Sequence, residues 1–134
     1  HRMNQIILAS HGKLATGMKA TLEFFGVQNI IILEQTVQET GFEAKAEAVL
    51  QQYAEQNCIV FTDLYGGSVN QIFFKNLQHY AFHLITGMNL AMILECAFTE
   101  ADLTGPQLKE IIENACRQTC YMNDLLTCGK EDDD

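Results

Sequence analysis

The sequence predicts an α/β fold: an open, doubly wound, mainly parallel sheet of about four strands, with helices on both faces. Two observations support this prediction. Four short apolar runs alternate along the 134 residues with segments whose apolar side chains recur at the helical period. The first three runs are apolar throughout, as expected of strands that a parallel sheet buries on both sides. For the strand order we adopt 2-1-3-4, which is common in sheets of this class.

The expected strands cover residues 5–9, 30–33, 58–61 and 83–85. Each segment that follows a strand carries its apolar side chains on one helical face. In the first three helices these side chains are Leu14, Met18, Leu22 and Phe25; Phe42, Ala46, Val49, Leu50 and Tyr53; and Val69, Ile72, Phe73 and Leu77. Parallel strands joined by helices of this kind require right-handed crossovers, which place helices on both faces of the sheet.

Two helix starts are marked by capping residues. Asn89 precedes a short apolar helix over residues 90–98, and an asparagine at this position accepts a hydrogen bond from a first-turn amide. Thr104 and Gln107 have the spacing of a capping box, with Pro106 in the first turn. We therefore expect the last helix to begin directly after Thr104.

Composition limits the classes of partner and the domain count. The chain has 8 Lys and Arg against 17 Asp and Glu, a net charge of −9, which argues against binding nucleic acid or an anionic membrane. No apolar run is long enough to span a bilayer, so we expect a cytoplasmic protein. We expect residues 3–128 to form one domain, residues 1–2 to be a cloning remnant, and residues 129–134 to be an acidic tail.

The five cysteines give no sign of a metal site or a disulfide framework. They are Cys58, Cys96, Cys116, Cys120 and Cys128. No pair has the C-x-x-C spacing of zinc sites, and an odd number suits reduced thiols. We therefore expect neither a metal nor a cofactor.

Candidate functional residues follow the first and the third expected strands. His11 lies in a polar, glycine-flanked turn after the first strand, and Asp63 follows the third. The carboxyl ends of these strands are neighbours in a 2-1-3-4 sheet, so the two segments should meet there. Gly66, Gly67 and Ser68 then lead into the third helix, where backbone N–H groups and the helix N-terminus favour an anion.

These residue types suit a phosphoryl group carried on histidine. A carboxylate that accepts the Nδ1–H of an imidazole fixes the tautomer and leaves Nε2 as a nucleophile. Phosphoryl transfer needs positioning and charge stabilisation more than covalent protein chemistry. We therefore expect His11 to be phosphorylated, Asp63 to orient its ring, and Gly66, Gly67 and Ser68 to bind the phosphate.

The same residues resemble a known family. The segments 6–12 (Ile-Ile-Leu-Ala-Ser-His-Gly), 62–68 (Thr-Asp-Leu-Tyr-Gly-Gly-Ser) and 85–95 resemble the IIA component of the mannose family of the bacterial phosphoenolpyruvate-dependent sugar phosphotransferase system. The resemblance extends from Met3 to about residue 126. It implies that the histidine takes a phosphoryl group from phosphorylated HPr and passes it to a IIB domain, upstream of the IIC and IID membrane components. It also implies a homodimer, although the only candidate for an exchanged C-terminal strand, residues 121–127, has a poor strand pattern.

Other functions stay open at this point. A phosphorylation-dependent regulatory module and the phosphotransfer subunit of a dihydroxyacetone kinase resemble this chain in the same way. A flavodoxin-like module would need a hydroxyl-rich loop after the first strand, and a serine hydrolase would need a nucleophile elbow; the sequence has neither. The transported sugar does not follow from these residues.

Overall fold

The computed structural model describes residues 3–126, and the expectations for residues 1–2 and 127–134 lie outside this range. Its sheet has four parallel strands in the order β2-β1-β3-β4, which confirms the predicted fold class and strand order. The strands are β1 (Asn4–His11), β2 (Ile31–Gln35), β3 (Asn57–Thr62) and β4 (His83–Thr86).

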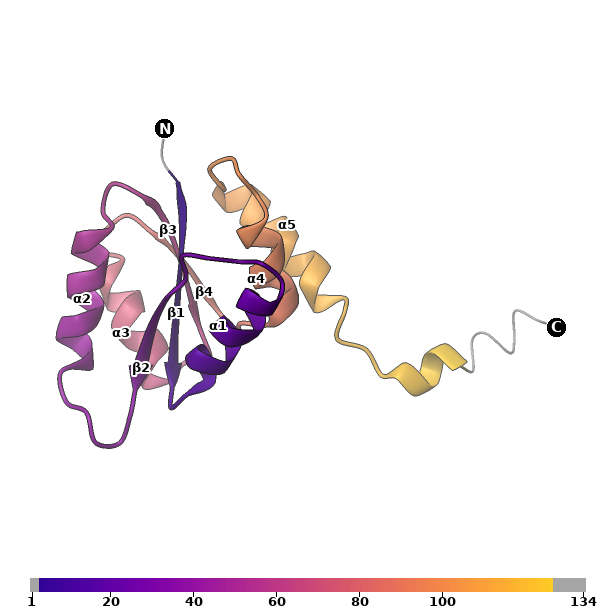
Figure 1. Ribbon diagram of the computed structural model, residues 1–134, viewed down its shortest axis with the longest axis horizontal. Helices are drawn as coiled ribbons and strands as arrows, with labels where there is room; N and C mark the ends of the chain where they lie inside the picture. Colours follow the sequence, from indigo (N-terminus) through magenta and orange to yellow (C-terminus); the bar gives the residue numbers. More distant parts are fainter. Residues whose placement is uncertain (1–2, 127–134) are drawn as a thin grey trace.

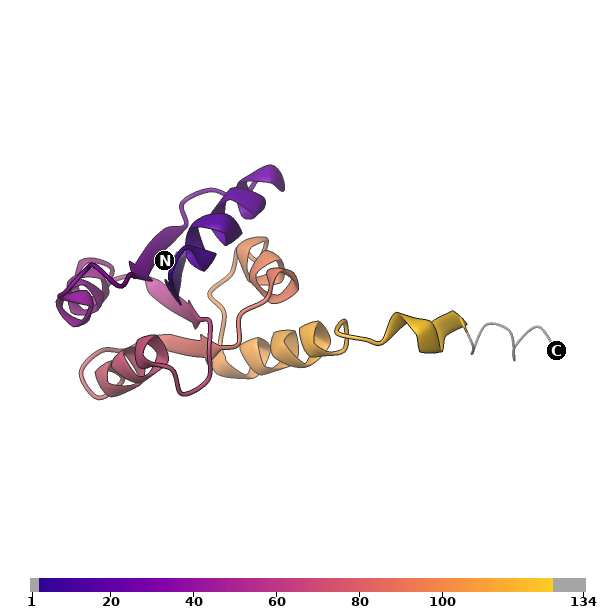
Figure 2. The same ribbon diagram turned by 90° about the horizontal axis from the view of Figure 1, so that it is seen from below.

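Helices cover both faces of this sheet (Figures 1 and 2). They are α1 (Leu14–Phe24), α2 (Phe42–Gln52), α3 (Ser68–Asn76), α4 (Leu90–Ala97) and α5 (Gly105–Cys116). Buried side chains of α1, α4 and α5 form one core, and those of α2 and α3 form a second core on the opposite face.

Alternation along the central strands explains why their sequences are continuously apolar. In β1, Ile6 and Leu8 pack into the core of α1, α4 and α5, whereas Ile7 and Ala9 pack into the core of α2 and α3. Successive side chains of a strand point to opposite faces, and here both faces are covered. An alternating polar pattern would therefore bury polar groups.

Both predicted helix caps are confirmed. The Asn89 side chain accepts a hydrogen bond from Met92 N at 2.9 Å. Thr104 forms the full capping box: its N–H donates to Gln107 Oε1 at 3.0 Å, and its hydroxyl oxygen accepts from Gln107 N at 3.4 Å. These caps satisfy backbone N–H groups that have no partner within the helix.

Two details of the first predicted helix are wrong. Leu14 and Phe25 were expected on its apolar face, but both are exposed. Ala15 and Leu22, two turns apart, define the buried face of α1, and Leu14 is about 100° around the helix from Ala15. Phe25 lies one residue beyond the end of α1, where it no longer follows the helical period.

After α5 the chain leaves the body of the protein and extends away from it (Figures 1 and 2). Residues 122–126 form a short helical segment rather than a strand. Its apolar side chains Met122, Leu125 and Leu126 are exposed, and so is the preceding Tyr121.

We predict that Phe73→Ala strongly destabilises the protein. The Phe73 side chain is 0% exposed, and its ring packs edge-on against Phe42 and Phe82, each with centroids 6.3 Å away. Removing a buried phenylalanine should lower the free energy of unfolding by about 3–5 kcal/mol, measured by urea denaturation. The matched control is Phe74→Ala on the same helix, which is 67% exposed and should change it by less than about 0.5 kcal/mol. Equal losses for both variants would contradict this assignment of the core.

Candidate functional site

The candidate site lies where the carboxyl ends of β1 and β3 meet. His11 is the last residue of β1, so the strand reaches two residues beyond the predicted one and includes the histidine. Asp63 directly follows β3, whose last residue, Thr62, is in register with Ala9. The 2-1-3-4 strand order thus brings together two segments that are about 50 residues apart in sequence.

Asp63 holds both the backbone and the ring of His11. Its Oδ2 accepts a hydrogen bond from His11 N at 2.8 Å and lies 3.0 Å from His11 Nδ1, and its Oδ1 lies 3.3 Å from the same Nδ1. The carboxylate is 10% exposed and the imidazole 41% exposed. A carboxylate next to Nδ1 requires a proton there, so the neutral ring presents an unprotonated Nε2.

The other ring nitrogen faces Ser68. His11 Nε2 lies 3.1 Å from Ser68 Oγ, and Ser68 is the first residue of α3. The N-terminus of a helix, with its positive dipole end, is therefore beside the nucleophilic nitrogen, where it favours an anion. The structure thus brings together His11, Asp63 and Ser68, the three side chains that the sequence singled out.

Gln35 also belongs to this cluster, and the sequence analysis missed it. Ser68 Oγ donates a hydrogen bond to Gln35 Oε1 at 2.7 Å. Gln35 ends β2 and is in register with His11, and Gly12 N donates to its carbonyl oxygen at 2.9 Å. The sequence did offer one signal, a polar residue at the end of the strand next to β1. Only the exact register of β2 against β1 shows that this residue lies level with His11.

The two glycines contribute to the loop in different ways, and their role in binding phosphate stays a prediction. Gly66 adopts a φ of +76°, which favours glycine in this turn. The N–H of Gly67 donates to Leu64 O at 3.0 Å, so this amide already has a partner within the protein. The contribution of Gly67 is space, because a Cβ at this position would lie 3.0 Å from His11 Cε1 and 3.3 Å from Leu64 O.

We therefore predict that Gly67→Ala impairs the histidine without unfolding the protein. The added methyl group must displace the imidazole from the position in which Asp63 holds it. A displacement of this kind should slow a reaction at Nε2 roughly 10- to 100-fold, measured as the rate of phosphorylation in the assay proposed below. Gly66→Ala is the contrasting control: its Cβ meets nothing within 4 Å, but its positive φ should cost roughly 1–2 kcal/mol of stability. A loss of stability without a slower reaction in Gly67→Ala, and a slower reaction without a loss of stability in Gly66→Ala, would contradict these roles.

Among residues 3–126, the other histidines and the cysteines lie outside the cluster. His83 begins β4 at the opposite end from its carboxyl edge, and His79 follows α3. Burial, with a smaller contribution from Glu95, raises the pKa of the Cys96 thiol to about 12. Within residues 3–126, no three His, Cys, Asp or Glu side chains gather in an arrangement that could hold a metal ion.

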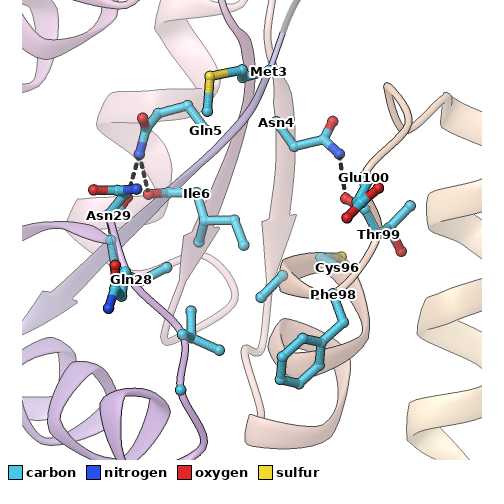
Figure 3. A pocket seen from close by; sticks show the side chains of 14 residues that line it. Met3, Asn4, Gln5, Ile6, Gln28, Asn29, Cys96, Phe98, Thr99 and Glu100 are labelled. Atoms are coloured by element: carbon cyan, nitrogen blue, oxygen red, sulfur yellow. Dashed lines mark hydrogen bonds between the residues drawn. The ribbon is translucent and has the colours of Figure 1, made fainter.

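Two hollows flank the fold. One, of about 470 Å³, lies at the amino ends of the strands (Figure 3). His11 is at the opposite end of β1. Two of its polar side chains already have partners: Gln5 Nε2 donates to Asn29 O at 2.8 Å, and Asn4 Nδ2 donates to Thr99 O at 3.0 Å. The other, of about 410 Å³, is lined by the loop before α3 and by α3 itself: Tyr65, Gly66, Asn70, Gln71, Phe74 and Lys75.

The chain matches one protein family over most of its length. Residues 5–116 match the family described as PTS system fructose IIA component (EIIA-man). No curated protein sequence matches significantly. No helix in the described part of the chain has the length and apolar character needed to cross a membrane.

Several solved structures share the fold over nearly the whole chain. A protein from Klebsiella pneumoniae, described as a phosphoenolpyruvate-dependent sugar phosphotransferase system permease, is 32% identical, with a TM-score of 0.81 over 93% of this chain and 95% of its own. The PTS IIA protein associated with the fucose utilization operon of Streptococcus pneumoniae is 25% identical, with a TM-score of 0.75 over 93% and 97%. The mannose/sorbose-specific IIA subunit from Enterococcus faecalis is 22% identical, with a TM-score of 0.80 over 88% and 93%.

Proposed function

The chain belongs to the family of PTS system fructose IIA components, and on that premise we propose that it is a phosphocarrier on which His11 takes a phosphoryl group from phosphorylated HPr and passes it to a IIB domain. The observation that carries this proposal is the contact between Asp63 and His11 Nδ1 at 3.0 Å, which leaves Nε2 unprotonated at a partly exposed position. Transfer from IIB to a sugar that enters through the IIC and IID membrane components would follow. We place this reaction in the cytoplasm.

The proposed step moves one phosphoryl group and no proton between protein groups. The lone pair of His11 Nε2 attacks the phosphorus of the donor phosphohistidine. A bond forms between Nε2 and phosphorus, while the bond between phosphorus and the donor nitrogen breaks and its electron pair returns to the donor ring. Nδ1 keeps its proton, and Asp63 stabilises the positive charge that develops on the ring. Ser68 and the N-terminus of α3 support the transferred phosphate.

A protein partner must bring its phosphohistidine to Nε2, and the surface beside His11 is suited to that. Leu64, Tyr65 and Phe74 are exposed apolar side chains on the loop before α3 and on α3 itself. Tyr65 and Phe74 border the hollow of about 410 Å³. Large exposed apolar side chains supply the desolvated contacts that dominate protein–protein affinity. We propose that HPr and IIB dock over these three residues.

We predict that Tyr65→Ala weakens binding of the donor protein without changing the chemical step. Tyr65 is 85% exposed, so its removal should leave the fold intact. The KM for phosphorylated HPr should rise roughly tenfold, while kcat stays within about twofold, in initial-rate assays of phosphoryl transfer. The control is Phe24→Ala, a change of another exposed aromatic residue, 83% exposed, at the end of α1 away from His11. An unchanged KM in Tyr65→Ala would show that the partner docks elsewhere.

We also propose that residues 3–128 act as one domain and that the protein is a homodimer. The apolar side chains of residues 121–126 support a dimer, because this segment extends away from the body (Figure 1) and these side chains are exposed. Sedimentation equilibrium of the purified protein tests this. A monomer at micromolar concentration would overturn the proposal.

The phosphocarrier proposal is tested with labelled phosphoenolpyruvate, enzyme I and HPr. The protein should acquire label only when both are present, and the label should be acid-labile and stable in alkali, as expected of phosphohistidine. Addition of a IIB domain should then discharge it. Failure to acquire label from phosphorylated HPr would overturn the proposal, and transfer of the label to dihydroxyacetone instead would identify a dihydroxyacetone kinase subunit.

A further inference from the structure

We propose that Gln35 is a positioning residue for phosphoryl transfer, because its side-chain oxygen keeps the hydroxyl proton of Ser68 away from the nucleophilic nitrogen of His11. This inference rests on the proposed phosphorylation of His11. It concerns a residue that neither the motifs of the sequence nor the expected anion site includes. Gln35 is partly buried, and β1 fixes its backbone through the bond from Gly12 N to its carbonyl oxygen.

The argument starts from the one hydrogen of the Ser68 hydroxyl. Two acceptors compete for this hydrogen: His11 Nε2 at 3.1 Å and Gln35 Oε1 at 2.7 Å. A hydroxyl donates one hydrogen bond at a time, and the shorter of these two contacts is the one to Gln35. With its hydrogen on Gln35, Ser68 presents an oxygen lone pair to Nε2 rather than a proton.

This arrangement affects the reactivity of the nitrogen. Asp63 requires the ring proton on Nδ1, so the lone pair that attacks phosphorus is on Nε2. A hydrogen bond from Ser68 to that lone pair would have to break before the attack, which adds to the barrier. Gln35 removes this cost, because it holds the hydrogen elsewhere while the lone pair stays free.

The same hydroxyl then has a second use during transfer. As the bond between Nε2 and phosphorus forms, the Ser68 hydroxyl turns from Gln35 Oε1 to an oxygen of the phosphoryl group. The proton stays on Ser68 Oγ, and only its acceptor changes. The side-chain amide of Gln35 carries both an acceptor and a donor group. After rotation, its NH₂ group donates to Ser68 Oγ and supports the bond from serine to phosphate.

Glutamine suits this position better than its close relatives. Leucine has a similar volume but no acceptor, so the Ser68 hydrogen would return to Nε2. Glutamate keeps an acceptor, but its charge would repel the arriving phosphoryl group. The glutamine amide therefore supplies the acceptor for the Ser68 hydrogen without a negative charge that would repel the phosphoryl group.

The first test compares rates of phosphorylation by HPr in a single turnover. Gln35→Leu should slow the reaction roughly three- to tenfold, the effect of one hydrogen bond of ordinary strength. In a Ser68→Ala background the same change should have no further effect, because no hydroxyl remains to be oriented. The matched control is Gln38→Leu in the exposed loop after β2, which should react like the wild type.

The second test needs no phosphoryl transfer. In ¹⁵N NMR spectra recorded at roughly pH 9, where imidazoles are neutral, the Nε2 resonance of His11 should move to lower frequency in Gln35→Leu, as expected when the nitrogen accepts a new hydrogen bond. Gln35→Glu keeps an acceptor and should leave the resonance near its wild-type position. Gln35→Leu in the Ser68→Ala background should not move it relative to Ser68→Ala alone.

The outcomes separate this inference from the proposed function. A wild-type protein that acquires no label refutes the phosphocarrier proposal, while the NMR comparison still reports on the hydrogen bond. A labelled wild type with an unchanged rate in Gln35→Leu refutes the role of Gln35. So does an equal slowing of Gln35→Leu with and without Ser68, since it would reveal an effect that does not pass through the hydroxyl.

Discussion

Replacement of His11 by alanine should abolish phosphorylation completely. The phosphoryl group is carried on the ring itself, so no partial activity is expected from the rest of the site. The fold should be unaffected, because the ring is 41% exposed and the backbone N–H of residue 11 still donates to Asp63 Oδ2. Incorporation of label from phosphorylated HPr should fall below detection, while the midpoint of urea denaturation stays near that of the wild type.

The matched control for this variant is His79→Ala. His79 is an exposed histidine that follows α3 and has no contact with the cluster. The His79→Ala variant should be labelled at the wild-type rate. Acid-labile label that persists in His11→Ala would move the carrier to another histidine. Acid-stable label in the same variant would point to a hydroxyl group, with Ser68 as the nearest candidate.

Replacement of Asp63 by asparagine should have the second largest effect. If the asparagine oxygen takes the place of Oδ2 and keeps the bond from His11 N, the NH₂ group takes the place of Oδ1, 3.3 Å from Nδ1, where it can donate to that nitrogen. The neutral amide no longer holds the proton on Nδ1 by its charge, so the tautomer with the proton on Nε2, which lacks the lone pair needed for attack, becomes populated. The rate of phosphorylation should fall roughly 10²- to 10⁴-fold, the range found when an orienting carboxylate is neutralised next to a catalytic imidazole.

The Asp63 variant also separates orientation from folding. The side chain of Asp63 is 10% exposed, and asparagine has nearly the same shape, so the protein should stay folded. ¹⁵N NMR should show the ring proton on Nε2 in Asp63→Asn and on Nδ1 in the wild type. If the variant kept the Nδ1 tautomer and the wild-type rate, the carboxylate would serve only to anchor the backbone of His11.

The sequence by itself determined which elements form and at which edge of the sheet the candidate site lies. Continuous apolar runs identified the strands, because a parallel sheet covered on both faces leaves no room for an alternating polar pattern. Asn89 and Thr104 identified two helix starts, because capping depends on side chains within three residues of each other. The strand order then predicted that His11 and Asp63 would lie at neighbouring strand ends.

The tertiary structure alone decided the contacts that depend on register. Gln35 reaches Ser68 because β2 ends level with His11, and a shift by one residue would point its side chain to the other face of the sheet. The N–H of Gly67 is bonded to Leu64, which no motif reveals. Local patterns depend on neighbours in sequence, whereas these contacts join three separate strands and loops, so only the packed sheet fixes them.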